Sequence, residues 1–196
     1  PVSDKPNDPM LGWHLNKCKL YDAWDVIHGD TAIVVCCVDE GVDWRHEDIE
    51  PNLWINHKED INHNGRFDDY PASQGGDLNG IDDDNNGKID DVIGWNFKHD
   101  TPDPSPDSLD PYYYYHGTGT TGVAVAATNN GKGIASPGWK CRAMAVNVDL
   151  DNAHINTTLS IQAIQYAANN GARVINMSFG GYGLDTYTGV LRYAVN

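Results

Sequence analysis

Three stretches of the chain have the apolar pattern of buried β-strands. Thr31–Val38 is a continuous run of apolar and β-branched residues, which is typical of a strand covered on both faces. Arg142–Val148 and Arg173–Phe179 repeat the pattern and predict two further strands. Cys36 and Cys37 are adjacent in the first strand, so their side chains should point to opposite faces. Of two interpretations for this pair, buried free thiols or a disulfide, we favour the thiols.

Helical patterns separate these strands. Thr157–Asn169 has apolar residues at helical spacing, and we expect Asn156 to cap its start and Asn170-Gly171 to end it. One face of this helix is predicted to carry Ile161, Ile164 and Ala168. Further helices are predicted over Leu20–Ile27, Gly122–Ala127 and Leu184–Asn196. Strands that alternate with helices imply an α/β fold: a three-layer, doubly wound and mostly parallel sheet with helices on both faces.

A long polar segment, residues 55–111, interrupts this pattern and is rich in Asp, Asn, Gly and Pro. A loop of this length without regular structure is either functional or disordered. Its 58–91 portion has ten acidic and three basic residues, a net charge of −7 in a chain whose total is −15. Such a density of like charge opposes folding unless cations neutralise it.

The overall acidity of the chain argues against two classes of binding partner. Nucleic acids and anionic membrane surfaces need clustered Lys and Arg, so neither is expected to bind. The chain has 196 residues, 40% of them hydrophobic, which fits one domain or a large piece of one. Its apolar runs are all shorter than the roughly 18 residues of a membrane helix. Because the chain begins at Pro1 rather than Met, we expect a processed or trimmed form.

The acidic segment contains a repeat with the spacing of a calcium loop. Residues 60–69 (DINHNGRFDD) match residues 82–91 (DDDNNGKIDD). Both have oxygen-bearing side chains at positions 1, 3 and 5, Gly at position 6, a main-chain carbonyl at position 7 and carboxylates at positions 9 and 10. Calcium takes about six to eight oxygen ligands, which such a loop supplies. We therefore predict two or more calcium ions, with these candidate ligands: Asp60, Asn62, Asn64, Arg66, Asp68, Asp69, Asp82, Asp84, Asn86, Lys88, Asp90 and Asp91.

The match to a calcium-binding EF-hand is partial. The acidic residue of position 12 is absent and flanking helices are not evident, so these are EF-like loops. Either position 9 or position 10 could close each loop. A solvated acidic loop without metal is the alternative, but two loops in register favour the metal, and calcium rather than magnesium.

Three short motifs occur in a characteristic order. The first predicted strand ends in Val38-Asp39-Glu40-Gly41-Val42-Asp43, and His116-Gly117-Thr118 opens the small-residue helix. The end of the last predicted strand and the two residues after it read Asn176-Met177-Ser178-Phe179-Gly180-Gly181. Together these motifs resemble the subtilisin-like serine peptidases, the subtilases, and the resemblance extends from about Trp13 to Val195. It implies that residues 1–196 are the N-terminal portion of one subtilisin-like peptidase domain, with an acidic calcium-binding insertion at about 55–111.

The resemblance assigns roles to individual residues. Asp39 would orient and charge-balance an imidazole, and His116 would be the general base of an Asp–His–Ser triad. A serine hydroxyl needs both groups, because it is a poor nucleophile at neutral pH. Ser178, Phe179 and Gly180 would offer main-chain groups to a polypeptide substrate that pairs as an added strand. Ser178 is not a candidate nucleophile, since it lies within that strand.

The resemblance also implies what lies outside the chain. The Gly-Thr-Ser motif of the nucleophile does not occur in residues 1–196, so we expect the serine in a downstream segment or a second chain of the same precursor. A propeptide partner and an extracellular or periplasmic, secreted bacterial protein are further expectations. Two other hypotheses stay open: an inactive calcium-binding subtilase-like module for protein binding or adhesion, and a simple acidic calcium-binding protein.

Overall fold

A parallel β-sheet forms the centre of the molecule. In the computed structural model its middle strand is β1 (Val34–Asp39), whose six residues are all buried. β3 (Arg142–Asn147) pairs with β1 on one side and β4 (Ala172–Asn176) pairs with it on the other, both in parallel. β2 (Gly94–Asn96) adds to β3 and completes the order β2-β3-β1-β4. The described residues are 5–108, 115–149, 156–180 and 187–195.

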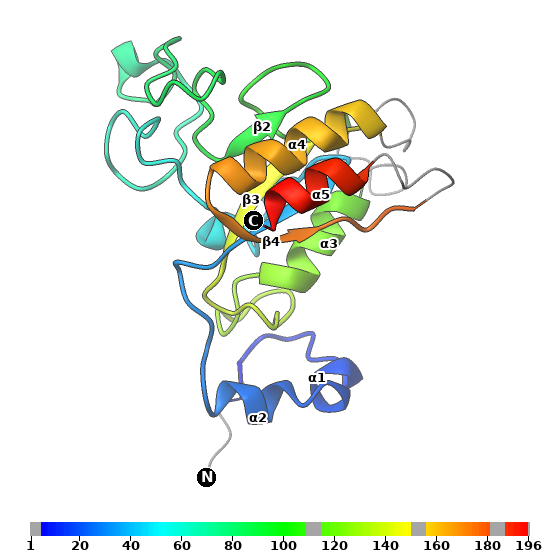
Figure 1. Ribbon diagram of the computed structural model, residues 1–196. Helices are drawn as coiled ribbons and strands as arrows, with labels where there is room; N and C mark the ends of the chain where they lie inside the picture. The colour runs from blue at the N-terminus through cyan, green and yellow to red at the C-terminus, as the bar shows by residue number, and fades with distance from the viewer. Residues whose placement is uncertain (1–4, 109–114, 150–155, 181–186, 196) are drawn as a thin grey trace.

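Helices cover both faces of this sheet (Figure 1). α4 (Thr157–Asn169) and α5 (Thr188–Ala194) lie on one face, and α3 (His116–Val125) lies on the other. Cys36 packs in the core cluster beneath α4 and α5, whereas Cys37 packs in the cluster beneath α3. Both are buried free thiols on opposite faces, as predicted. The predicted three-layer α/β architecture is therefore confirmed.

α4 matches its predicted bounds because its caps are encoded locally. The Asn156 side chain accepts hydrogen bonds from the main-chain nitrogens of Thr158 and Leu159. At the other end Asn170 is the C-cap, and Gly171 follows with a φ of 85°. The buried face differs slightly from the prediction: Ile164 is fully buried, but the other predicted residues, Ile161 and Ala168, are only partly covered. The centre of the face is instead Ala163, Ile164 and Ala167.

Several predicted segments have different limits in the structure. The helix predicted over Gly122–Ala127 is α3, which begins at His116 and ends at Val125, and the strand predicted from Thr31 begins at Val34. The strand predicted over Arg173–Phe179 ends at Asn176, so Ser178, Phe179 and Gly180 follow β4 instead of belonging to it. The polar segment predicted over residues 55–111 contains β2, which is fully buried. A strand of three residues is too short to produce a periodic pattern, which is why the sequence did not reveal it.

The remaining helices are short. α2 (Leu20–Trp24) covers most of the predicted helix Leu20–Ile27, and α1 (Trp13–Lys17) precedes it without having been predicted. Two 3₁₀ turns, η1 (Glu50–Asn52) and η2 (Ala72–Gln74), lie in the loops after β1. α5 falls within the predicted helix Leu184–Asn196, whose first three residues and last residue lie outside the described residues. Among the helices that the structure describes, none could span a bilayer.

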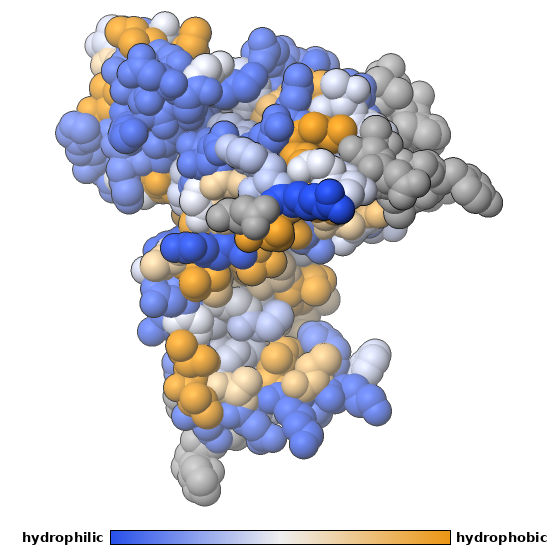
Figure 2. Space-filling model, in the orientation of Figure 1, coloured by the Kyte–Doolittle hydropathy of each residue, from blue (hydrophilic) through white to orange (hydrophobic). Residues whose placement is uncertain are grey.

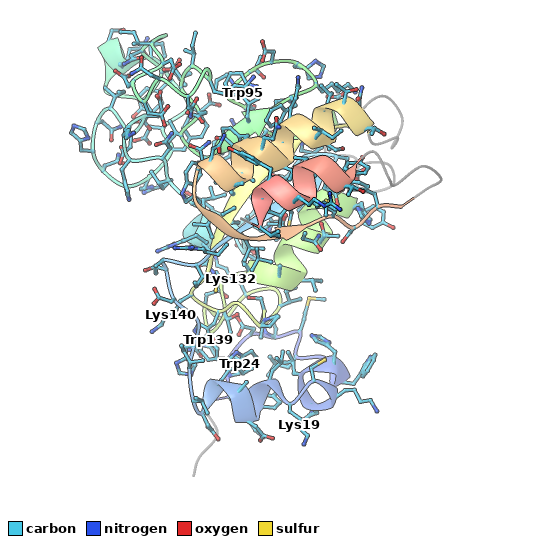
Figure 3. The ribbon with its side chains drawn as sticks, viewed as in Figure 1. Lys19, Trp24, Trp95, Lys132, Trp139 and Lys140 are labelled. Carbon is cyan, nitrogen blue, oxygen red and sulfur yellow. The ribbon has the colours of Figure 1, made fainter. Side chains whose placement is uncertain are left out.

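The N-terminal helices are attached through aromatic side chains. The rings of Trp24 and Trp139 meet edge to face with centroids 4.9 Å apart. Figure 3 labels both residues at this end of the molecule. Leu15, Trp24 and Ala135 form a small separate core at this contact. In addition, the buried carboxylate of Asp8 accepts hydrogen bonds from the main chain of the 129–130 loop. The N-terminal segment that contains Asp8, α1 and α2 thus packs against the loops that follow α3.

A glycine at the start of β2 gives the first test of this fold. Gly94 has a φ of 137°, and a Cβ there would overlap the carbonyl oxygen of its paired residue Ala145. We expect Gly94→Ala to destabilise the protein by at least about 3 kcal/mol, because clash and backbone strain add. Gly75→Ala is the control, since Gly75 also has a positive φ (92°) but open space around it. Denaturant unfolding measures both, and equal losses would contradict the predicted clash.

Candidate functional site

The carboxylate of Asp39 and the imidazole of His116 meet where β1 ends and α3 begins. The Nδ1 atom of His116 lies 2.9 Å and 3.0 Å from the two carboxylate oxygens of Asp39. Asp39 is only 1% exposed, whereas the His116 side chain keeps 49% of its surface exposed. The carboxylate is therefore buried, and the imidazole faces solvent.

Hydrogen bonds hold the Asp39 carboxylate in place. The main-chain nitrogen of Glu40 donates to Oδ1 at 2.9 Å, and the Thr120 hydroxyl donates to Oδ2 at 3.3 Å. The hydrogen bond that His116 donates to Asp39, together with the negative charge of Asp39, raises the pKa of His116. With Nδ1 engaged by Asp39, the Nε2 atom on the opposite edge of the ring is free to accept a proton.

Two glycines allow α3 to come this close to β1. A Cβ at Gly117 would overlap the carbonyl oxygen of Gly41 and would lie 3.1 Å from the Cβ of Asp39. Gly41 itself has a φ of 98°, a left-handed conformation that favours glycine. The glycines of the two sequence motifs therefore set the distance between the carboxylate and the imidazole.

A groove of about 420 Å³ runs beside the imidazole. It is bounded by α3 on one side and by β4 with the residues after it on the other; its lining includes His116, Val123, Val174, Asn176 and Ser178. Of the three predicted substrate-binding residues, Ser178 thus shares a groove with His116. Its hydroxyl is hydrogen-bonded to the Asn176 side chain at 2.9 Å. Phe179 instead packs toward the α5 side, near Tyr187, and Gly180 is exposed.

The acidic repeat of the sequence is also a repeat in structure. In the first loop the Asp60 carboxylate accepts hydrogen bonds from the main-chain nitrogens of Asn64 and Gly65, at 3.2 Å and 2.8 Å. In the second loop Asp82 does the same for the equivalent residues Asn86 and Gly87, at 3.0 Å and 2.8 Å. Position 1 therefore curls the chain over positions 5 and 6 in both loops. The loops form a hydrophilic lobe that projects from the sheet (Figures 1 and 2).

The carboxylate that closes each loop differs between them. In the first loop Asp68, at position 9, accepts from the Asn64 amide at 2.6 Å. In the second loop it is Asp91, at position 10, that accepts from the Asn86 amide at 2.9 Å. The two other predicted ligands turn away, because each has a different partner. Asp69 pairs with Arg45, and Asp90 accepts from the main-chain nitrogens of residues 79 and 80.

The side chains at position 7 also point elsewhere. Arg66 is paired with Glu50 at 3.2 Å, and Lys88 is paired with Asp100 at 2.8 Å. The prediction for these two residues concerns their main-chain carbonyls, which stay available as candidate ligands. Asn62 and Asp84, at position 3, keep their side chains within the loops: Asn62 donates to Asp68, and Asp84 accepts from the main chain of Asn86.

Two buried carboxylates outside the repeat were missed by the sequence analysis. Glu59 accepts hydrogen bonds from the main-chain nitrogens of Asp84 and Asp90, both at 3.1 Å. Asp77 accepts from those of Asn62 and Asp68, at 3.4 Å and 2.7 Å. Each thus contacts positions 3 and 9 of one loop, and each is 0% exposed. The density of acidic residues was the available signal, but spacing alone did not single them out.

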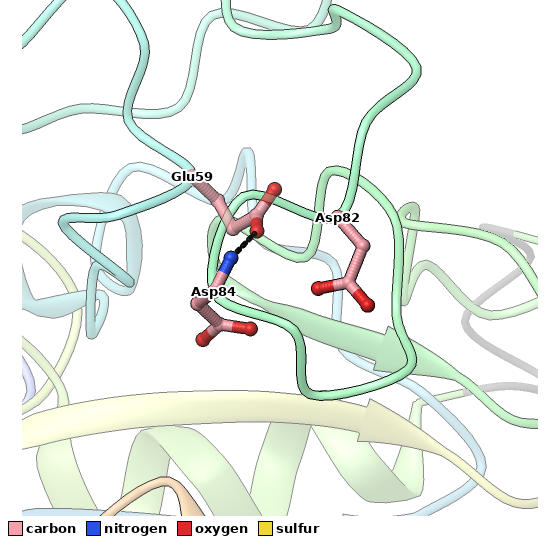
Figure 4. Close-up of side chains that lie close together, drawn as sticks. All are labelled: Glu59, Asp82 and Asp84. Carbon is pink, nitrogen blue, oxygen red and sulfur yellow. Dashed lines mark hydrogen bonds between the residues drawn. The ribbon is translucent and has the colours of Figure 1, made fainter.

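Glu59 brings a third carboxylate to the second loop. Ligand oxygens of Glu59, Asp82 and Asp84 all lie within 4.8 Å of one another. Figure 4 shows the three side chains gathered at the second loop. Burial raises the pKa of Glu59 to about 7, and burial raises the pKa of Asp91 to about 6. The shifts mean that negative charge is costly at these positions. The oxygens of this cluster could hold a cation, which would remove that cost.

Comparison with known proteins agrees with the α/β fold described above. The model described as "Subtilase family" matches residues 30–194, and the chain belongs to this family. A solved structure described as proteases from Pseudoalteromonas arctica PAMC 21717 superimposes with a TM-score of 0.67 at 21% identity. It covers 96% of this chain and 55% of its own, and supports the fold alone.

Curated relatives are proteases from distant organisms. Subtilisin-like protease 1 of Plasmodium vivax is 30% identical over 94% of this chain, and thermitase of Thermoactinomyces vulgaris is 30% identical over 90%. The halolysin-like extracellular serine protease Nep of Natrialba magadii is 29% identical over 89%. The chain spans between 26% and 48% of the length of these three relatives.

The link between Asp39 and the imidazole can be tested by titration. In Asp39→Asn the imidazole loses a charged acceptor, so the pKa of His116 should fall. The titration is followed by NMR of the His116 ring in the full-length protein. Asp25→Asn is the control, because Asp25 is exposed and lies at the end of α2. An unchanged His116 titration in Asp39→Asn would show that the two side chains do not interact in solution.

Proposed function

We propose that the protein is a secreted, calcium-stabilised serine endopeptidase that hydrolyses peptide bonds with an Asp–His–Ser triad. One observation carries this proposal: a half-exposed imidazole held by a buried carboxylate at the carboxyl edge of a parallel sheet. Asp39 and His116 supply two members of the triad. The serine is expected in a downstream segment or a second chain of the same precursor.

The arrangement supports each step that these two residues would perform. His116 Nε2 takes the proton of the serine hydroxyl as the oxygen attacks the substrate carbonyl, and later delivers it to the leaving amine. Asp39 keeps Nδ1 protonated and stabilises the imidazolium that forms in between. The substrate would lie along the groove beside Ser178, where main-chain groups after β4 are not used by the sheet.

An additional segment would complete the site. β4 lies at the edge of the described sheet, and Val174 on it is 49% exposed. Across the groove, Val123 and Tyr115 are 63% and 61% exposed. Apolar side chains of this size are a favourable surface for another part of the protein to cover. The proposed occupant is the segment that carries the serine.

The proposed activity can be tested with a fluorophosphonate probe, which labels activated serines. We expect the full-length protein to be labelled, and His116→Ala to slow labelling at least about a thousandfold, because the hydroxyl loses its base. His14→Ala is the control, since His14 is exposed on α1. Labelling that is independent of His116 would contradict the proposed triad. An unlabelled wild-type protein would favour the alternative of an inactive subtilase-like module for binding or adhesion.

Calcium is proposed as the resident ion of the two acidic loops. Two observations support this proposal. The residue at position 1 makes the same turn in both loops, and each loop is contacted by a buried carboxylate from outside the repeat, Asp77 at the first loop and Glu59 at the second. Glu59, Asp82, Asp84 and Asp91 would serve the second loop, and Asp60, Asp68 and Asp77 the first. Hard carboxylate and carbonyl oxygens are the donor set that calcium prefers. Bound calcium would neutralise the net charge of this segment and fix its conformation.

If each acidic loop binds its own calcium ion, a substitution at one loop should weaken that site and leave the other unchanged. Glu59→Gln should weaken one site and Asp77→Asn the other, each by about 10- to 100-fold, because each removes one buried carboxylate. Calorimetric titration of the full-length protein with calcium measures both sites, and Asp22→Asn on α2 is the matched control. Chelation should lower the melting temperature by about 5–10 °C. Unchanged binding in both variants, together with an unchanged melting temperature, would contradict the proposal.

Placement outside the cell is part of the same proposal. The relative from Natrialba magadii is named as an extracellular protease, and calcium is abundant outside cells. A propeptide remains an additional predicted partner. Partners that need clustered basic residues, such as nucleic acids, are not proposed for a chain of this acidity.

A further inference from the structure

The residue after Asp39 makes a second contact with the general base. Glu40 is only 4% exposed, and its Oε1 accepts a hydrogen bond from the main-chain nitrogen of His116 at 2.8 Å. His116 is the first residue of α3, whose first turn has main-chain nitrogens without partners inside the helix. The residue at the N-cap position, Tyr115, makes no capping hydrogen bond with its side chain in the described structure. Glu40 therefore caps α3 from the end of β1.

Neighbouring elements hold Glu40 in this position. Its main chain pairs with Asn147 at the end of β3. Asn147 in turn donates from its side-chain amide to the carbonyl oxygen of Ser105 at 2.9 Å, and Val42 donates to the carbonyl oxygen of Pro104 at 3.1 Å. The segment around residues 104–105 thus lies across the turn that follows Asp39. Glu40 is buried by this packing and is directed to the start of α3.

A carboxylate does more here than a neutral cap would do. Ser, Thr or Asn can satisfy a helix N-terminus, so the hydrogen bond alone does not require a negative charge. Glu40 places a second acidic side chain beside an imidazole that becomes positively charged during proton transfer. Like Asp39, it therefore favours the imidazolium electrostatically.

We propose that Glu40 is a positioning residue for the general base. Its carboxylate fixes the main chain of His116 so that the imidazole faces Asp39, and its charge stabilises the imidazolium. This inference rests on the proposed function for its catalytic consequence, but its structural part concerns His116 alone. Other charged groups near this region are Asp149, which follows β3, and Lys98, which pairs with Asp149 at 3.3 Å and with Asp107 at 2.6 Å. Lys98 offsets those two carboxylates, so Asp39 and Glu40 are the acids that act on the imidazole.

The test compares Glu40→Gln with Glu40→Ala in the full-length protein. Glu40→Gln keeps an acceptor oxygen but removes the charge, whereas Glu40→Ala removes both. Both variants should lower the pKa of His116, measured by NMR of its ring. With a fluorogenic peptide, kcat should fall on the order of tenfold and the acidic limb of the kcat/KM pH profile should move to lower pH. KM should stay unchanged, because Glu40 bonds to the main chain of His116 and not to substrate. Glu47→Gln is the matched control, since Glu47 lies in the same segment but is exposed and paired with Lys132.

Each outcome decides the inference. If Glu40→Gln leaves both the His116 titration and kcat at wild-type values, the charge has no role and the proposal is overturned. If neither variant folds, the wild-type protein still gives an answer: the amide proton of His116 should shift with the titration of a carboxyl group as well as with its own ring. A single step at the ring pKa would overturn the contact. These NMR measurements do not require peptidase activity. An inactive protein would refute the proposed function, but the same measurements would still test the contact between Glu40 and His116.

Discussion

Burial of β1 on both faces is the constraint on which the rest of this structure depends. A strand with apolar side chains on each side must be covered twice, and the chain meets this need with α3 on one face and α4 with α5 on the other. The strand becomes polar only at its carboxyl end, where Asp39 is its last residue and Glu40 follows. Helix α3 begins at the same edge, because Gly117 permits close approach to Gly41. The Asp39–His116 pair thus lies where the apolar run of β1 ends.

The structure handles buried negative charge in two different ways. At the end of β1, Asp39 is matched by an imidazole and by hydrogen-bond donors, and this pairing raises the pKa of His116. In the acidic lobe Glu59 and Asp91 are buried beside other carboxylates, and burial raises their pKa values to about 7 and about 6. The first arrangement is complete within the described residues and prepares a proton acceptor. In the second, main-chain nitrogens donate to Glu59, and the side chains of Tyr166, Asn86 and Asn56 donate to Asp91. These donors are neutral, so the calcium proposed above would supply the compensating charge.

The sequence predicted those parts of the fold and site that depend on local pattern. The apolar run of β1, the Asn156 cap of α4 and the repeated spacing of the acidic loops each express their structure within a few residues. Glu59 and Asp77 escaped prediction because their role depends on the path of the chain between the loops. The same is true of Glu40, whose partner His116 is 76 residues away. The end of β4 at Asn176 was also misjudged, since hydrogen bonding to β1, and not hydrophobicity, decides where that strand stops.

The acidic lobe is connected to the groove beside His116 by a short chain of contacts. The Tyr166 hydroxyl on α4 donates to Asp91 at 2.6 Å, and the Asn56 amide bridges Asp84 and Asp91 at 3.0 Å and 3.1 Å. α4 leads directly through the turn at Gly171 into β4, which borders the groove beside His116. Ordering the second loop therefore restrains the helix that positions β4. The calcium proposed for this loop would therefore act on the groove through packing, without contact to Asp39 or His116.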